Sequence, residues 1–179
     1  MRTDPVSIEM RDLAGGPLDL EVNCDPKVLD LEDDEFTFTQ NVTGMVQFNR
    51  IGKRVLGKGT LQAEASSPCV RCLEPAHVIV EVPIDCIFEN DPDLLNPKSH
   101  VVNPDDQIVN YFDGDLINPR EEFREAILVA LPTLPICRPD CKGLCPTCGS
   151  NLNVTECKCA RDGDDTEDWK SQLKNLRLE

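Results

Sequence analysis

The sequence predicts an α+β protein in which an antiparallel β-sheet or partly open barrel carries one packed amphipathic helix and a small C-terminal cysteine-rich zinc module. Three observations support this prediction. Residues 42–65 and 78–88 alternate apolar and polar side chains, as half-buried strands do. Residues 119–131 repeat apolar side chains at helical spacing. Six of the ten cysteines fall within residues 137–159.

The first 41 residues contain short strand-like pieces around Val6–Met10 and Leu18–Val22, separated by a glycine-proline turn. An acidic loop at Asp25–Glu35 follows. Cys24 stands apart from the other cysteines, so we interpret it as a small buried apolar residue.

Residues 42–65 are expected to form a β-hairpin, because Gly52-Lys53 suits a two-residue II′ turn. That turn sets the register of the two strands. It places bulky residues opposite small ones, and the predicted pairs are Phe48 with Gly57, Val46 with Gly59, Gly44 with Leu61, and Val42 with Ala63.

A tight connection, Cys69-Val-Arg-Cys72, leads into a long strand with one buried face. That face comprises Val78, Val80, Val82, Ile84, Cys86 and Phe88. Pro83 interrupts the strand and indicates an edge position or a bulge.

A short strand at Gln107–Phe112 precedes the helix. Asn118 is expected to cap this helix, with Pro119 at its first position and Pro132 at its end. Its apolar stripe comprises Phe123, Ala126, Ile127, Ala130 and Leu131. A last short helix is predicted around Trp169, Leu173 and Leu176.

The bulk composition narrows the compartment and the chemistry. Met1–Pro5 leads into no apolar run, and the longest apolar stretch near Ala126–Leu131 is too short to span a membrane. The cytoplasm is therefore the expected location, and ten cysteines there indicate metal or redox chemistry.

The cysteine segment centres on Cys145-Pro-Thr-Cys148-Gly149, a spacing that lets two thiolates hold one ion. Sulfur ligands favour zinc or iron, and we expect one Zn²⁺ or two. Cys145 and Cys148 are the first candidates. Cys157 and Cys159 would lie on one face of an extended segment and complete a tetrahedron. Cys141 and then Cys137 are the next candidates, and a disulfide cluster is the alternative.

Four interpretations of Cys69 and Cys72 remain open. The two thiols could form a redox pair, although no helix N-terminus is expected after Cys72 to lower a thiol pKa. They could complete a zinc site with Cys145 and Cys148. They could be a separate functional pair beside Arg71, or a simple buried pair.

The charge distribution indicates one candidate binding surface. The net charge is −15, yet residues 42–73 carry five cations against a single acid, Glu64. The cations are Arg50, Lys53, Arg54, Lys58 and Arg71. Together with Cys69 and Cys72 they could bind phosphates, or they could be solvated charges that protect an edge strand.

Several stretches of the chain resemble the YceD family of large ribosomal RNA subunit accumulation proteins, also called domain of unknown function 177. These are Cys69-Val-Arg-Cys72-Leu-Glu, Asp115-Leu-Ile-Asn-Pro-Arg-Glu, and Cys141-Lys-Gly-Leu-Cys-Pro-Thr-Cys-Gly-Ser-Asn-Leu-Asn153. Near the C-terminus Thr166-Glu167 replaces the Pro-Arg usual in that family.

The resemblance implies a YceD-like body over residues 1–135 and a metal module with a short helix over residues 136–179. It also implies a non-enzymatic factor that binds ribosomal RNA, a ribosomal protein or an assembly intermediate, with no membrane and no small-molecule substrate. A thiol-disulfide oxidoreductase is the alternative function, using the Cys69–Cys72 pair.

Overall fold

The computed structural model describes residues 4–91 and 109–159, and its main element is an open β-sheet. The sheet order is β2 (Leu18–Cys24), β4 (Val42–Ile51), β5 (Arg54–Pro68), β6 (Pro75–Asn90) and β7 (Val109–Phe112). All neighbours are antiparallel except β6 and β7, which run parallel. The short β3 (Thr37–Phe38) pairs with the second half of β5. The sheet is therefore open, which decides between the two predicted architectures.

The β4–β5 hairpin has the predicted register. Phe48 faces Gly57, Val46 faces Gly59 and Gly44 faces Leu61, which confirms three of the four predicted pairs. Gly52 has a φ of 63° in the turn, a conformation that glycine adopts without steric cost. The strands continue well beyond this turn, and β5 and β6 pair along their entire length from Arg54–Glu89 to Pro68–Pro75.

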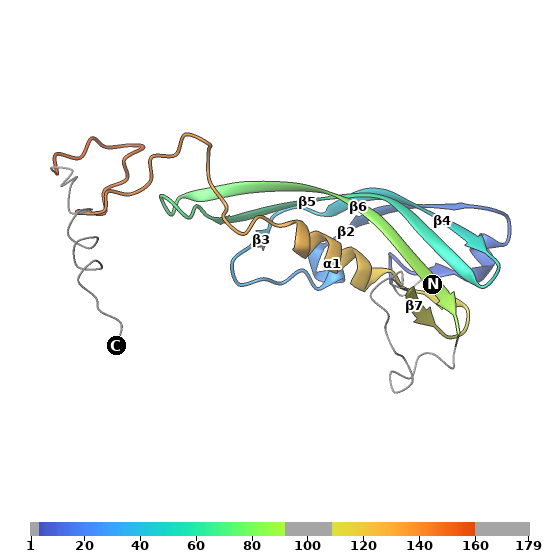
Figure 1. Cartoon of the computed structure of the whole chain (residues 1–179). Coiled ribbons are helices and arrows are strands. Elements are labelled where there is room, and N and C mark those ends of the chain that lie inside the picture. Colours follow the sequence, from blue (N-terminus) through green and yellow to red (C-terminus); the bar gives the residue numbers. More distant parts are fainter. Residues whose placement is uncertain (1–3, 92–108, 160–179) are drawn as a thin grey trace, which may run out of the picture.

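The buried face of the sheet forms the core together with the helix α1 (Arg120–Ala130). Alternate residues of β6 from Val80 to Phe88 are buried, including Cys86, and Cys24 is buried at the end of β2. Phe123 and Ile127 of α1 are fully buried, and α1 packs against β6 and the 3-10 helix η2 (Pro26–Leu29). Figure 1 shows α1 lying along one face of the sheet.

The remaining elements differ from the prediction only in detail. β1 (Ile8–Glu9) pairs with β8 (Leu116–Ile117), and the 3-10 helix η1 (Met10–Leu13) follows β1. α1 begins at Arg120 rather than at Pro119, while the side chain of Asn118 accepts a hydrogen bond from the backbone N–H of Arg120. Pro83 lies on a part of β6 that pairs with β5 alone among the described strands, since β7 meets only Ile87–Asn90.

Residues 107 and 108 of the predicted short strand, and the predicted helix around Trp169, lie outside the described residues. No helix in the described part of the chain is long and apolar enough to cross a membrane. After α1 the chain runs to the far end of the β5–β6 hairpin, where residues 136–159 lie (orange in Figure 1).

Candidate metal centre

Eight cysteines lie in two separate groups of four at the far end of the β5–β6 hairpin. The first group comprises Cys69, Cys72, Cys137 and Cys141, and the second comprises Cys145, Cys148, Cys157 and Cys159. Within each group the four Sγ atoms all lie within 4.8 Å of one another. Either group could therefore hold a metal ion. The two remaining cysteines, Cys24 and Cys86, are buried in the sheet core and belong to neither group.

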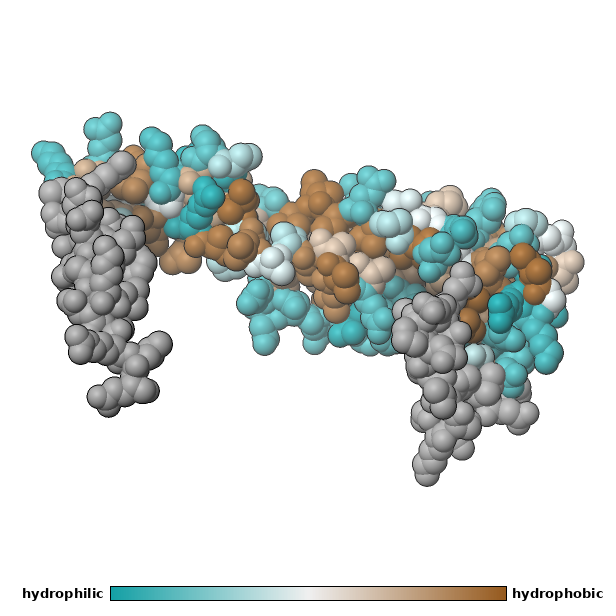
Figure 2. All heavy atoms as spheres, viewed as in Figure 1, coloured by the Kyte–Doolittle hydropathy of each residue, from teal (hydrophilic) through white to brown (hydrophobic). Residues whose placement is uncertain are grey.

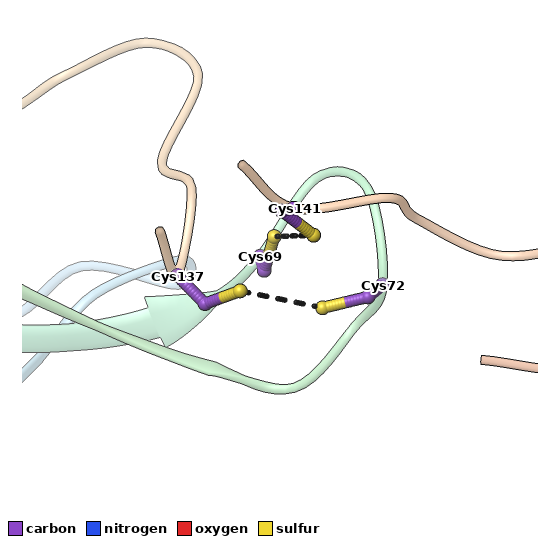
Figure 3. Close-up of side chains that lie close together, drawn as sticks. All are labelled: Cys69, Cys72, Cys137 and Cys141. Carbon is purple, nitrogen blue, oxygen red and sulfur yellow. Dashed lines mark hydrogen bonds between the residues drawn. The ribbon is translucent and has the colours of Figure 1, made fainter. Parts of the chain in front are cut away.

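The first group joins two distant parts of the chain (Figure 3). Cys69 and Cys72 come from the connection between β5 and β6, and Cys137 and Cys141 come from the segment after α1. The Sγ atoms of Cys69 and Cys141 are 3.9 Å apart, and those of Cys72 and Cys137 are 3.6 Å apart. Cys69, Cys72 and Cys141 are buried, while Cys137 is half-buried.

The backbone explains why the two segments meet. The N–H of Val70 donates to the carbonyl oxygen of Pro135 at 2.9 Å, and the N–H of Leu144 donates to that of Arg71 at 2.9 Å. The Arg71 guanidinium also donates to the carbonyl oxygen of Cys141 at 3.1 Å. These bonds fasten the Cys69–Cys72 connection between the two parts of the later segment.

The second group is more exposed and is built locally. The N–H of Cys145 donates to the Ser150 carbonyl oxygen at 2.8 Å, which closes the loop around Cys148. The Cys157 Sγ lies 3.4 Å from the Sγ atoms of both Cys145 and Cys148. The N–H of Cys159 donates to the Cys157 Sγ at 3.2 Å.

Each group contains a thiol whose pKa is well below the ordinary value. Burial raises the pKa of Cys69, but hydrogen bonds from the backbone of Cys137, Arg71 and Cys72 outweigh it and bring the pKa to about 6. Hydrogen bonds from the side chain and backbone of Ser150 lower the pKa of Cys148 to about 6. A metal ion is bound by thiolates rather than thiols, so these donors favour the form that a metal requires.

Two of the other thiols in each group have raised pKa values. Burial, together with hydrogen bonds to Cys72 and Cys141, raises the pKa of Cys137 to about 12. Hydrogen bonds to Cys157 and Cys148 raise the pKa of Cys159 to about 12. Without metal, protons are therefore shared unevenly within each group, and binding of a metal ion would displace them.

The grouping of the cysteines differs from the one expected from sequence. The structure brings together Cys145, Cys148, Cys157 and Cys159, the four thiols ranked first. It separates Cys137 and Cys141 from them and places these two beside Cys69 and Cys72. The structure does not show the alternative grouping in which Cys69 and Cys72 complete a zinc site with Cys145 and Cys148. The closest sulfur pairs are 3.4 Å apart, far longer than a disulfide bond of about 2.05 Å.

The expected binding surface is divided between two ends of one strand. Arg50, Lys53, Arg54 and Lys58 lie at or near the β4–β5 turn, whereas Arg71 follows the other end of β5. β5 has 15 residues, so these ends are about 50 Å apart at about 3.3 Å per residue. Cys69 and Cys72 are buried, so their side chains are not on the surface.

Acids that are distant in sequence accompany two of these cations. Arg54 pairs with Glu89 at 2.8 Å and Lys58 pairs with Asp85 at 3.3 Å, because β6 lies beside β5. The Lys58–Asp85 pair is largely exposed, whereas Glu89 of the other pair is only 19% exposed. These acids lie outside residues 42–73, so the charge count over that range did not include them. The alternating pattern of the following strand could have indicated them, because it predicts a strand that can lie beside β5.

The family of the chain is shown by its match to a family model described as large ribosomal RNA subunit accumulation protein YceD, which covers residues 57–177. The chain belongs to this family. The matched region includes β5 from Gly57 onward, β6, α1 and all eight clustered cysteines.

Curated relatives match over a part of their length. An uncharacterized protein of Mycobacterium leprae is 30% identical over 126 residues, which are 70% of this chain and 54% of that protein. An uncharacterized protein of Mycobacterium tuberculosis is 33% identical over 102 residues, which are 57% of this chain and 47% of that protein. A chloroplastic maize protein, large ribosomal RNA subunit accumulation protein YCED homolog 1, is 28% identical over 170 residues, covering 82% of this chain and 54% of that protein. The chain spans about half the length of these relatives, and no solved structure matches it.

Proposed function

We propose that this protein is a non-enzymatic factor for the accumulation of large-subunit ribosomal RNA. It acts by binding ribosomal RNA, a ribosomal protein or an assembly intermediate that contains them, and Zn²⁺ in its cysteine groups serves a structural role. The observation that carries the proposal is the family match, which extends from the β5–β6 hairpin through both cysteine groups. The cytoplasm is the compartment in which we expect it to act, and no membrane or small-molecule substrate takes part.

One candidate contact surface is the β4–β5 turn. Arg50 and Lys53 are exposed there, and neither forms an ion pair with a carboxylate among the described residues. Arg54 and Lys58 lie next to them, but their paired acids reduce the charge that they offer. A small cationic tip on an otherwise acidic protein suits a contact with a few phosphates.

A second candidate surface is the end of the β5–β6 hairpin around the first cysteine group. Five of the ten exposed large apolar residues of the described chain come from the three segments that meet there. They are Val70, Leu73, Leu134, Ile136 and Val154. In Figure 2, apolar residues (brown) lie among hydrophilic ones (teal) at this end, to the left. Exposed aliphatic side chains favour a protein partner, and a ribosomal protein fits the proposed role.

Depletion of the protein in its own organism tests the function. The ratio of large-subunit to small-subunit ribosomal RNA should fall as the protein is lost and should recover when the gene is restored. Crosslinking of the tagged protein in cells, followed by RNA sequencing and mass spectrometry, then identifies the partner. An unchanged ratio in cells that lack the protein would contradict the proposal.

A charge reversal tests the turn surface separately. The double variant Arg50→Glu with Lys53→Glu should lower large-subunit ribosomal RNA while leaving thermal stability nearly unchanged, because both side chains are exposed. The control Arg11→Glu with Lys27→Glu makes the same change in net charge at two exposed positions away from the hairpin. Normal ribosomal RNA in the first variant, at wild-type protein abundance, would remove the turn from the contact surface.

A thiol-disulfide oxidoreductase is the second candidate function, and the low pKa of Cys69 favours it. Attack on a disulfide requires access to the sulfur, and Cys69 is fully buried. The donors that lower its pKa also hold it beside three other sulfurs. Reduction of insulin by the purified protein, lost in Cys69→Ser, would support the oxidoreductase over the structural role.

A further inference from the structure

We infer that Cys69, Cys72, Cys137 and Cys141 hold a Zn²⁺ ion of their own, distinct from a second ion at Cys145, Cys148, Cys157 and Cys159. The ion of the first group fastens the end of the β5–β6 hairpin to the segment that follows α1. This inference rests on the structural zinc of the proposed function and not on its role in ribosomal RNA accumulation, and it is argued from the arrangement of the thiols.

The sulfur positions match those of a tetrahedral zinc site. A Zn–S bond of about 2.3 Å gives sulfur–sulfur edges of about 3.8 Å in a tetrahedron. The Sγ–Sγ separations of 3.9 Å for Cys69 and Cys141 and of 3.6 Å for Cys72 and Cys137 lie on either side of this value. All four sulfurs are mutual neighbours and converge on a common point (Figure 3).

The stoichiometry follows from the separation of the two groups. Eight thiols supply four ligands to each of two ions, and no cysteine belongs to both groups. Bridging sulfurs are therefore unnecessary. Because three of its four cysteines are buried and all four positions are occupied by thiols, the first site is closed in the manner of a structural zinc site rather than a catalytic one.

The surroundings of the first group suit an ion with four thiolates, which carries a net charge of −2. The Asn153 amide donates to the Cys141 Sγ at 3.3 Å, and the Arg71 guanidinium lies against the Cys141 carbonyl oxygen. Donors of this kind orient and stabilise the ligands of a metal site. The side-chain amide of Asn153 also donates to the side-chain oxygen Oδ1 of Asn151 at 2.9 Å, which fixes its position.

Apart from the hydrogen bonds already described, little apolar packing holds this end of the protein together. The buried cluster here consists of Cys69, Cys72, Cys141 and Ala76, with Cys137 and Leu144 packed against it. No large apolar side chain is fully buried in this cluster, in contrast to Phe48 and Phe123 in the main core. An ion that binds Cys72 and Cys137, 65 positions apart, would supply the link that apolar packing does not.

The position of Gly143 supports the same arrangement. Its φ is +75°, and a Cβ at this position would lie 3.1 Å from the carbonyl oxygen of Arg71. The chain between the two groups therefore passes in direct contact with the Cys69–Cys72 connection. Gly143 lies between Cys141, which belongs to the first group, and Cys145, which belongs to the second.

Metal analysis of the full chain tests the inference. Protein reconstituted with Zn²⁺ alone should contain two ions per chain. The variant Cys69→Ser with Cys72→Ser and the variant Cys137→Ser with Cys141→Ser should each contain one ion. The variant Cys148→Ser with Cys157→Ser should also contain one, and the control Cys24→Ala should retain two. Co²⁺ in place of Zn²⁺ should lose half of its sulfur charge-transfer absorption in each of the three paired variants.

Limited proteolysis distinguishes the two sites. Loss of the first site should expose residues 132–144 to thermolysin, whereas loss of the second should restrict cleavage to residues after 144. Circular dichroism should show an intact sheet in the three paired variants, because no clustered cysteine belongs to the sheet core. A single ion in the wild-type protein, or two ions in either variant of the first group, would overturn the inference.

Discussion

Replacement of Gly57 by alanine should destabilise the sheet through a single crowded contact. An alanine Cβ at this position would lie 2.6 Å from the Cε1 atom of Phe48 and 2.7 Å from the Cys86 Sγ. Phe48 is fully buried and Cys86 is 5% exposed, so neither side chain can turn toward solvent. The crowding comes from side chains rather than from the backbone, and Gly57 has no positive φ.

The size of the effect follows from the required movement. Carbon atoms pack at about 3.5–4.0 Å, so the Phe48 ring and the Cys86 thiol must each retreat by about 1 Å. Overpacking of this kind costs about 1–3 kcal/mol. The alanine also lowers the conformational entropy of the unfolded chain, which offsets about 0.4–1 kcal/mol of this cost. We therefore expect the free energy of unfolding to fall by about 1–2 kcal/mol.

Urea unfolding of the zinc-loaded protein, followed by circular dichroism of the strands, measures this change. Gly15→Ala is the matched control, since nothing lies within 4 Å of its Cβ position and its φ is not positive. Combining Gly57→Ala with Phe48→Leu should cost less than the sum of the two single changes, because the smaller side chain makes room. Gly59→Ala should cost more and resist such rescue, since its Cβ would lie 2.1 Å from the backbone oxygen of Met45. A Gly57→Ala protein that unfolds at the wild-type urea concentration would refute the reasoning.

Three further predictions concern the cysteine-bearing end. Leu73 has a φ of 63° and is 67% exposed, so Leu73→Gly should leave the free energy of unfolding unchanged or raise it by up to about 1 kcal/mol. If the hairpin end contacts a partner, the yield of crosslinks between the protein and that partner should nonetheless fall. Cys69 and Cys148 have lowered pKa values of about 6, so their thiolates stabilise the folded state above the ordinary pKa of 9, and this stabilisation is lost as the pH falls through 6. Zinc release, followed with a coloured chelator, should therefore increase with acidity. Cys24 and Cys86 are buried in the sheet core, whereas the eight clustered cysteines lie outside it. After chelation, iodoacetamide at pH 8 should therefore label the eight clustered cysteines and spare Cys24 and Cys86, as mass spectrometry of peptides would show.

The sheet was predictable from sequence because its signals are local. Gly52 fixes the turn between β4 and β5, and the turn fixes the register in which Phe48 meets Gly57. The buried face of β6 follows from simple alternation. The boundary of α1 differed by one residue because Pro119 precedes the helix, while the expected cap, Asn118, still accepts the backbone hydrogen bond of Arg120.

The partners of the cysteines were not predictable from spacing alone. Proximity along the chain favoured a site built within residues 137–159, yet Cys137 and Cys141 lie beside Cys69 and Cys72. That arrangement depends on where the β5–β6 hairpin ends relative to the exit of α1, which is a property of the tertiary fold. One signal in the sequence was the number of cysteines, because eight cysteines outside the core are enough for two sites with four ligands each.

The surroundings of the charged residues also depend on the tertiary fold, and they decide which of the two candidate surfaces is the stronger. Pairing with β6 brings Glu89 to Arg54 and Asp85 to Lys58, while β5 carries Arg71 away from the turn.

The two cysteine loops can be compared within one chain. Gly149 follows Cys148 with a φ of 72°, and Leu73 follows Cys72 with a φ of 63°. Glycine adopts this conformation freely, whereas leucine does so at a cost and gains little burial in return. A contact made by the exposed Leu73 side chain would offset that cost, which makes the hairpin end the stronger of the two candidate surfaces.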